Sequence, residues 1–378
     1  MQRRKRTLLT DSNYLRAMVY HVIGTMSGSS MDGLDIAYCS FEEIGGKWSF
    51  TIKHAICYPF DDQWKQTLAS ITTLPAKQLL LTHAAFGHWM GHAIQNFIEQ
   101  FGLEHKVHLI ASHGHTVFHE PKLGMTFQMG DGAAIASINK LPVVSDLRNM
   151  DIALGGQGAP IVPIGEKLLF NQYRYFLNLG GICNITIAHE DKHLAFDICA
   201  ANRVLNLLML ELNLSYDENG NEARKGQLNN ELLSSLNLLD YYQQPFPKSL
   251  SNEFGTETIL TLIQSYSIPV HDKLHTMCIH IAQQIKSSLA RFQQNEPSKL
   301  LVTGGGAFNT FLVECITNEL AALQVEVVIP SNELVEYKEA LVMALIGVLR
   351  WREEENVLSS VTGASRSSVG GALWMGQD

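Results

Sequence analysis

Several features that mark secreted, membrane-spanning or nucleic-acid-binding proteins are missing from this sequence. Its six cysteines are scattered over 378 residues without a CxxC pair, which argues against a disulfide framework and favours a reducing, cytoplasmic environment. No apolar run approaches the length of a membrane-spanning helix. Lysine and arginine (28) are fewer than aspartate and glutamate (37), so a net charge of -9 gives no basic footprint for nucleic acid or an anionic membrane. A local basic pocket for a phosphate group stays compatible with this balance.

The start of the chain does not read as a secretory signal. A basic stretch from Arg3 to Arg6 is followed by polar residues through Asn13, where a signal peptide would have an apolar core. We predict that residues 1–17 form a disordered extension outside the fold.

The sequence does contain enough apolar material for two hydrophobic cores. Apolar residues make up 46% of the chain and charged residues 17%, as in ordinary globular proteins. A chain of 378 residues is longer than one core usually organises, so two lobes are expected.

A strand, a turn of glycine and polar residues, and a returning strand occur once in each half of the chain. Strands are predicted at residues 19–25, 34–41 and 48–58 in the first half, and at 173–179, 182–189 and 192–196 in the second. A duplicated lobe fits this repetition better than one doubly wound sheet, with an N-terminal lobe at 18–165 and a C-terminal lobe at 166–378. Helices are also predicted at 61–70, 76–100, 204–212, 275–294 and 336–354, and strands at 107–112, 141–146, 300–303 and 325–329.

Three turns of small residues each follow a predicted strand, and small residues let backbone N–H groups approach a phosphate chain closely. The first turn (residues 26–33) contains Asp32 and is followed by Asp35, and such carboxylates suit Mg²⁺, directly or through water. The second turn (178–184) contains two consecutive glycines and the third (303–306) contains three. None of them is a Walker A loop, because no Gly-Lys-Ser/Thr follows. Their order resembles the phosphate-1, phosphate-2 and adenosine motifs of actin-like ATPases and sugar kinases.

A series of longer motifs resembles the anhydro-N-acetylmuramic acid kinases from about residue 20 to the C-terminus. The first motif is IGTMSGSSMDGLD (23–35), and the others are SHGHT (112–116), GDGAA (130–134), SDLRNMD (145–151), GGQGAP (155–160), NLGGICN (178–184), PKS (247–249), GGGAFN (304–309) and SVTGAS (360–365). The resemblance implies an α/β, two-lobed actin/hexokinase-like fold, in which each lobe is ribonuclease H-like and a cleft separates the lobes.

The resemblance also implies a reaction with two coupled parts. The substrate is 1,6-anhydro-N-acetylmuramic acid, a product of peptidoglycan turnover, and the cofactors are ATP and Mg²⁺. Water opens the anhydro ring at C1 while the freed O6 takes the γ-phosphoryl group, which gives N-acetylmuramic acid 6-phosphate for cell-wall recycling. A homodimer is implied as well, with no nucleic-acid or membrane partner.

Matching positions give the site residues that the resemblance implies. Asp197, in AFDICAAN (195–202), matches the general base for the water, and Asp32 is the candidate Mg²⁺ ligand. Residues expected to bind ATP and its phosphates are Gly28, Ser29, Ser30, Met31, Asp32, Gly33, Leu34, Asp35, Asn178, Gly180, Gly181, Asn184, Gly304, Gly305, Gly306 and Asn309. Residues expected to contact the sugar are His113, Thr116, Asp131, Arg148, Asp151, Gln157 and Asn202.

The sequence departs from the family pattern at two places. Family members usually carry Thr-Gly-Pro-Gly-Asn after the aspartate, whereas this chain has Ile-Cys-Ala-Ala before Asn202. His115 stands where glutamine is more common. The first departure bears on substrate preference and rate more than on the fold.

The residues alone leave other roles open. Asp197 also suits a helix N-cap, and Arg148 suits an ion pair within its lobe as well as a bidentate contact with the lactyl carboxylate of the sugar. Lys248 suits a phosphate contact or an exposed surface position. Two histidine-rich groups lack structural-zinc spacing, so packed or surface histidines are expected there: His113, His115 and His119, and His271, His275, Cys278 and His280.

Three other functions are alternatives to the ring-opening kinase. A kinase for a different amino sugar would explain the altered run after Asp197. A non-catalytic sugar- or nucleotide-binding relative would not need Asp32, Asp35 and Asp197 together with three intact turns. An actin-like polymerising protein is disfavoured by the GGQGAP segment (155–160).

Overall fold

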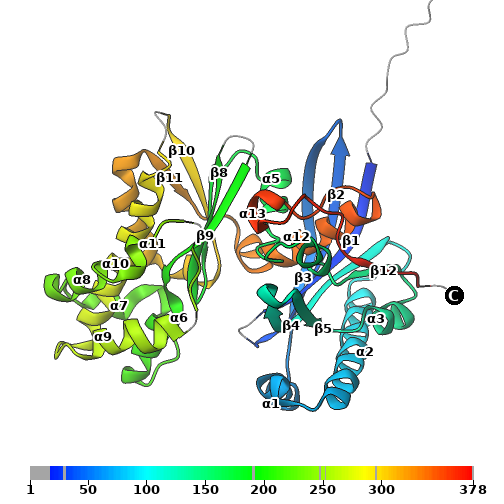
Figure 1. Ribbon diagram of the computed structural model, residues 1–378, viewed down its shortest axis with the longest axis horizontal. Helices are drawn as coiled ribbons and strands as arrows, with labels where there is room; N and C mark the ends of the chain where they lie inside the picture. The colour runs from blue at the N-terminus through cyan, green and yellow to red at the C-terminus, as the bar shows by residue number, and fades with distance from the viewer. Residues whose placement is uncertain are drawn as a thin grey trace, which may run out of the picture.

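The computed structural model describes residues 18–28, 31–189, 192–246, 248–251, 253–293 and 296–376, arranged as two lobes side by side (Figure 1). The predicted extension at residues 1–17 lies outside the described residues, as do Ser29 and Ser30 of the first turn and Pro247 of the PKS motif.

The first sheet begins with a three-stranded antiparallel meander. β1 (Met18–Ser27) pairs with β2 (Gly33–Ile44), and β2 pairs with β3 (Lys47–Pro59). β4 (Leu109–Glu120) joins β1 in parallel, β6 (Val143–Ser145) joins β4 in parallel, and β5 (Met125–Met129) pairs with β4 as a hairpin. The order is therefore β3-β2-β1-β4-β6, with β12 (Ala372–Trp374) on the outer side of β6.

The second sheet repeats this arrangement. β7 (Tyr175–Leu179), β8 (Ile182–His189) and β9 (Lys192–Ala200) form an antiparallel meander, and β10 (Ser298–Thr303) and β11 (Val325–Val328) follow in parallel beyond β7. The order β9-β8-β7-β10-β11 is the same 3-2-1-4-5 order as in the first sheet. The predicted duplicated, ribonuclease H-like fold of the actin/hexokinase type is thus confirmed, and the three glycine-rich turns follow β1, β7 and β10.

The helices cover the two sheets and close the lobes. In α2 the buried residues Phe86, Met90, Ile94 and Phe97 recur at helical spacing and form one apolar face. None of the helices in the described ranges is both long and apolar enough to cross a membrane. The helices are α1 (Asp62–Ser70), α2 (Ala76–Gln100), α3 (Gly132–Asn139), α4 (Asn149–Ala153), α5 (Pro163–Leu169), α6 (Asn202–Met209), α7 (Asn221–Lys225), α8 (Asn230–Asn237), α9 (Leu260–Gln264), α10 (Val270–Ala290), α11 (Thr310–Leu320), α12 (Asn332–Trp351) and α13 (Ser359–Thr362).

The C-terminal part of the chain returns to the first sheet. α12 packs on β1 and β2 so closely that a Cβ at Gly24 would collide with the carbonyl oxygen of Ala340. β12 pairs with β6 in the first sheet. The predicted assignment of all of residues 166–378 to the second lobe does not match this pairing, because β12 completes a sheet edge far away in sequence.

The two lobes share a hydrophobic core around α5 and α12. Phe176 and Leu301 of the second sheet pack in one cluster with Leu341 and Ala344 of α12 and with Val22 of the first sheet. An ion pair crosses this region from Lys338 of α12 to Glu166 of α5, with Nζ and Oε1 2.6 Å apart and side chains that are only 6% and 4% exposed.

Candidate active site

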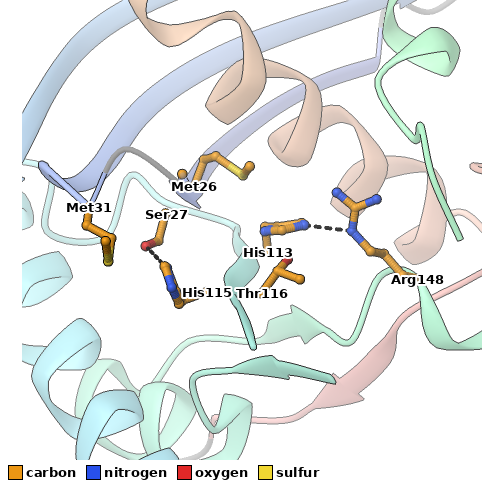
Figure 2. Close-up of a pocket in the computed structure, with 8 residues that line it drawn as sticks. Met26, Ser27, Met31, His113, His115, Thr116 and Arg148 are labelled. Carbon is orange, nitrogen blue, oxygen red and sulfur yellow. Dashed lines mark hydrogen bonds between the residues drawn. The ribbon is translucent and has the colours of Figure 1, made fainter. Parts of the chain in front are cut away.

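The first turn forms one wall of a cavity of about 310 Å³ in the first lobe (Figure 2). β1 and β4 run in parallel, which puts Ser27 in register with His115, and Ser27 Oγ lies 2.9 Å from His115 Nδ1. Burial lowers the pKa of His115. The cavity is lined by Met26, Ser27, Gly28, Met31, His113, His115, Thr116 and Arg148.

His113 and Arg148 form a second pair in this cavity (Figure 2). Arg148 Nε donates to His113 Nε2 over 2.8 Å, and His113 Nδ1 lies 3.0 Å from the carbonyl oxygen of Gly114. Because a guanidinium only donates and a carbonyl only accepts, His113 must be neutral with its proton on Nδ1. Burial, reinforced by the charge of Arg148, lowers the pKa of His113 to about 3, in agreement with this tautomer.

Part of the Arg148 guanidinium makes no hydrogen bond within the described residues. Nη1 donates to the carbonyl oxygen of Gly158 over 2.7 Å, while Nη2 makes no hydrogen bond with any described residue. Burial lowers the pKa of Arg148 to about 10, and the carboxylate of Glu339 opposes this shift. The side chain therefore stays charged at neutral pH. The hydrogen bonds of Arg148 go to neutral groups, so the side chain is not fixed by the ion pair that was an alternative in the sequence analysis.

Carboxylates gather next to the first turn. Burial, together with the negative charges of Asp32, Glu339 and Glu336, raises the pKa of Asp35 to about 6, and a hydrogen bond with Cys57 opposes the rise. A Mg²⁺ site at Asp32 stays a prediction, because the described residues contain no group of three His, Cys, Asp or Glu side chains that could hold a metal ion. Leu34, by contrast, is fully buried in the core and presents only its backbone to the turn.

The second and third turns lie against each other. A Cβ at Gly304 would collide with Oδ1 of Asn178, and a Cβ at Gly306 would come within 2.9 Å of Oδ1 of Asn202. Asn202 also donates from Nδ2 to the carbonyl oxygen of Leu179 over 2.8 Å. The second and third turns are therefore in contact, and their membership of one nucleotide site stays a prediction.

A row of polar residues crosses the second sheet beside these turns. Thr303 is in register with Asn178, Asn178 with Asn184, and Asn184 with Asp197. Neighbouring residues on β7 point to opposite faces, and Leu177 packs in the core of the second lobe. The row consequently lies on the face of the sheet that turns toward α12 and the first lobe.

Asp197 is half-buried at the end of this row. Its Oδ2 accepts a hydrogen bond from the backbone N–H of Leu250 over 2.8 Å, and no described residue bonds to Oδ1. Burial raises the pKa of Asp197, and the Leu250 bond opposes the rise. The strand predicted at 192–196 was too short, because β9 continues to Ala200 and Asp197 lies within it. The helix N-cap role is excluded too, since Ala201 is the N-cap of α6.

Comparison with known proteins identifies the family. The family profile described as anhydro-N-acetylmuramic acid kinase matches residues 20–376. The chain belongs to the anhydro-N-acetylmuramic acid kinase family. It is 32% identical to the anhydro-N-acetylmuramic acid kinase of Vibrio vulnificus (strain YJ016) over 364 residues, which cover 93% of this chain and 97% of that protein. It is 30% identical to the enzyme of the same name from Bacillus thuringiensis (strain Al Hakam) over 381 residues, covering 94% and 98%.

The resemblance seen in the sequence motifs is therefore confirmed, and with it the assignment of the chain as a kinase that transfers phosphate to a hydroxyl. A more distant likeness links the chain to a solved activator of the 2-hydroxyisocaproyl-CoA dehydratase from Clostridium difficile, with a TM-score of 0.42 and 15% identity, covering 88% of this chain and 96% of that one.

The family's glycine-rich run after the aspartate is replaced by core residues in this chain. Ile198, Cys199, Ala200 and Ala201 are 0–2% exposed and pack in the hydrophobic core of the second lobe. The backbone N–H groups of Ala201 and Asn202 donate to the carbonyl oxygens of Gly181 and Gly180. These amides are thus bound to the second turn and are not presented to a ligand.

Several residues expected to touch ligands have structural roles here. Asp151 is fully buried, with Oδ1 accepting from Thr362 Oγ1 and Oδ2 from the Gly158 N–H, each over 2.7 Å. Asp131 caps α3, and Asn309 caps α11 through Leu312 N. In each case a helix cap or a buried hydrogen bond uses at least one polar atom of the side chain. Gln157 and Thr116 are exposed, and of these two only Thr116 lines the cavity.

Lys248 and the second histidine group are also accounted for by packing. Lys248 donates from Nζ to the carbonyl oxygen of Tyr241 over 2.9 Å and lies over the Tyr241 ring. His280 is fully buried and bonds to Asn237 Oδ1 and to the Tyr242 hydroxyl. Across the ranges that the structure describes, no three His, Cys, Asp or Glu side chains are grouped to hold a metal.

Some residues of the site were not predicted from the sequence, because their contacts are with residues far away along the chain. Ser27 directly precedes the predicted site residue Gly28, and only its pairing with His115 gives it a part in the cavity. The Leu250 N–H carries no side-chain signal at all. The PKS motif just before Leu250 was the one available hint, since the carbonyl oxygen of Lys248 accepts from the Asp197 N–H over 3.0 Å.

Proposed function

We propose that this chain opens the ring of 1,6-anhydro-N-acetylmuramic acid and phosphorylates the freed hydroxyl with ATP. Water attacks C1, the bond between C1 and O6 breaks, and O6 takes the γ-phosphoryl group while ADP leaves. The product is N-acetylmuramic acid 6-phosphate. A place in cell-wall recycling, a cytoplasmic location and a homodimer belong to the same proposal.

The observation that carries the proposal is the setting of Asp197. One carboxylate oxygen is held by the Leu250 N–H, and the other makes no bond with a described residue. A carboxylate fixed in this way can take a proton from water, and its raised pKa brings it closer to the working pH of a general base. The neighbouring turns supply backbone N–H groups, as expected where positioning and electrostatics drive phosphoryl transfer.

The nucleotide fits the contact between the second and third turns. Gly304 and Gly306 leave no room for a side chain against Asn178 and Leu179, and this close contact brings together the backbones of the two turns, where we expect the phosphate chain to bind. Asp32 and Asp35 would hold Mg²⁺, directly or through water, and the ion would neutralise phosphate charge when bound.

The sugar fits the cavity of the first lobe. Arg148 presents Nη2 from a guanidinium whose other nitrogens are fixed by His113 and Gly158. A guanidinium recognises a carboxylate through paired N–H donors, and the lactyl group of N-acetylmuramic acid carries one. Asn202, beside both glycine turns, would complete the site from the second lobe.

A coupled ADP-release assay with magnesium-ATP tests the proposal. Wild type should turn over the anhydro sugar and not a panel of open-ring hexosamines, and Asp197→Asn should lose turnover by a factor of about 10³. Turnover on an open-ring hexosamine instead would contradict the ring-opening step.

A kinase for a different amino sugar is the second candidate. Its support is the core-packed run 198–201 in place of the family's glycines, together with His115 where glutamine is more common. The same hexosamine panel distinguishes it, because this candidate predicts ADP release with an open-ring sugar.

A further inference from the structure

Arg203 is a cation beside the second turn that neither the motifs nor the family pattern singled out. It is the second residue of α6, and its backbone N–H donates to the carbonyl oxygen of Gly181 over 3.4 Å. A Cβ placed on Gly181 would meet Cβ and Nε of Arg203 at 3.6 and 3.8 Å. The stem of the side chain therefore lies against the tip of the second turn.

The guanidinium of Arg203 is not satisfied by the protein that surrounds it. Its Nε is buried without a hydrogen-bond partner, and none of the ion pairs in the described ranges includes Arg203. Glu253 experiences its charge without forming an ion pair with it. Buried donors are nearly always paired in folded proteins, so an unpaired Nε indicates a partner that arrives from outside the chain.

Other cations near the site have a different place or partner. Arg148 bonds to His113 and Gly158 and lines the cavity of the first lobe, Lys248 bonds to a backbone carbonyl, and Lys338 bonds to Glu166. The three turns contain no lysine of the Walker A kind. Phosphoryl transfer depends on positive charge at the phosphate chain, and arginine suits phosphate because its planar fork donates two bonds at once.

We propose that Arg203 binds the phosphate chain of the nucleoside triphosphate at the second turn. The inference rests on nucleotide use in the proposed function and adds a residue to it. Asn202, the preceding residue, already contacts both glycine turns, so the polyphosphate would lie between backbone N–H groups and the Arg203 guanidinium. In the free protein Glu253 would partly offset the charge that phosphate later neutralises.

Calorimetric titration of the full chain with magnesium-ATP, magnesium-ADP and adenosine tests the assignment. Arg203→Gln removes the charge, Arg203→Lys restores a point charge, and Arg291→Gln is a matched loss of charge at an exposed site of the same lobe. We expect Arg203→Gln to weaken magnesium-ATP binding by about tenfold or more and to leave adenosine binding within about twofold. Arg203→Lys should recover part of the loss, and Arg291→Gln should bind like wild type.

Two results would overturn the assignment. Wild-type affinity of Arg203→Gln for magnesium-ATP would show that the guanidinium does not touch phosphate. A structural role would show itself if Arg203→Gln bound adenosine and magnesium-ATP equally weakly and had a lower thermal stability than wild type. Arg203→Lys would then recover neither binding nor stability. If wild type itself binds no nucleotide, both the proposed function and the role of Arg203 are wrong. If wild type binds magnesium-ATP and Arg203→Gln binds it equally well, only the role of Arg203 is wrong.

Discussion

Leu250 donates its backbone N–H to Oδ2 of Asp197 over 2.8 Å, from a segment that lies 53 residues further along the chain. A second bond joins the same segment to the strand, from Asp197 N to the carbonyl oxygen of Lys248. The hydroxyl of Tyr241 donates to the Asp197 carbonyl oxygen over 2.7 Å. Both the backbone and the carboxylate of the candidate base are therefore fixed from outside its own sheet.

Leu250→Pro tests this relationship because proline has no N–H. A donor to the carboxylate favours its charged form, so losing the donor should raise the pKa of Asp197 beyond the rise that burial already causes. The base works when deprotonated, so activity falls as pH drops through this pKa, and the acid limb of kcat/KM should move to higher pH in Leu250→Pro. Leu250→Ala keeps the N–H and should keep the wild-type limb. An unchanged limb in Leu250→Pro would contradict the role.

His113→Ala should impair recognition of the acidic sugar. Without Nε2, Arg148 loses the acceptor that orients its guanidinium, and we expect KM for the anhydro sugar to rise about tenfold with a smaller change in kcat. His113→Gln offers another acceptor and should recover part of the loss. The same sugar without its lactyl group serves as the control substrate, because its KM should not respond to His113. Equal losses on both sugars would contradict the account.

Thr362→Val tests how Asp151 supports the cavity. The Thr362 hydroxyl donates to buried Oδ1 of Asp151, whose Oδ2 holds Gly158, and the carbonyl oxygen of Gly158 holds Arg148. An unpaired buried carboxylate oxygen should cost about 1–3 kcal/mol of unfolding free energy and should raise KM for the sugar. Thr317→Val, at an exposed helical position, is the matched control, and chemical denaturation is the measurement. Equal stability of the two variants would refute the link.

Lys338→Ala should be strongly destabilising. The ion pair with Glu166 is almost completely buried. Removal of one partner therefore leaves an unpaired buried charge, which should lower the free energy of unfolding by about 3–5 kcal/mol. A double variant, Glu166→Leu with Lys338→Met, should be much closer to wild type, because neither charge is left alone. Denaturant midpoints of the three proteins check this, and a single variant as stable as the double one would argue against a tightly buried pair.

Local patterns in the sequence were enough to predict the meander of each lobe. Strand propensity and the glycine turns located β1 to β3 and β7 to β9, since these signals lie within a few residues of one another. The extension of β9 through residues 197–200 was missed, because apolar residues after an aspartate fit a strand or a helix start equally well. The return of α12 and β12 to the first sheet was missed because it depends on pairing across more than 200 residues.

The site shows the same limit at the level of single side chains. Asp197, the glycine turns and Arg148 follow from residue type and motif. The hydrogen bond from Thr362 to buried Asp151 and the use of Asn309 as a helix cap could not be predicted in this way. The residue type alone does not show whether a carboxylate or an amide binds a ligand or a neighbouring group of the protein. Arg203 belongs to no motif, and only the position of its unpaired Nε beside Gly181 points to a role.

The most direct test of the central claim is to run the reaction in ¹⁸O-labelled water and determine the mass of the phosphorylated sugar. The account predicts one solvent oxygen at C1 of the product from wild type, and no labelled product from Asp197→Asn. A phosphorylated sugar that carries no solvent oxygen, or labelled product from Asp197→Asn at the wild-type rate, would contradict ring opening by water that Asp197 activates.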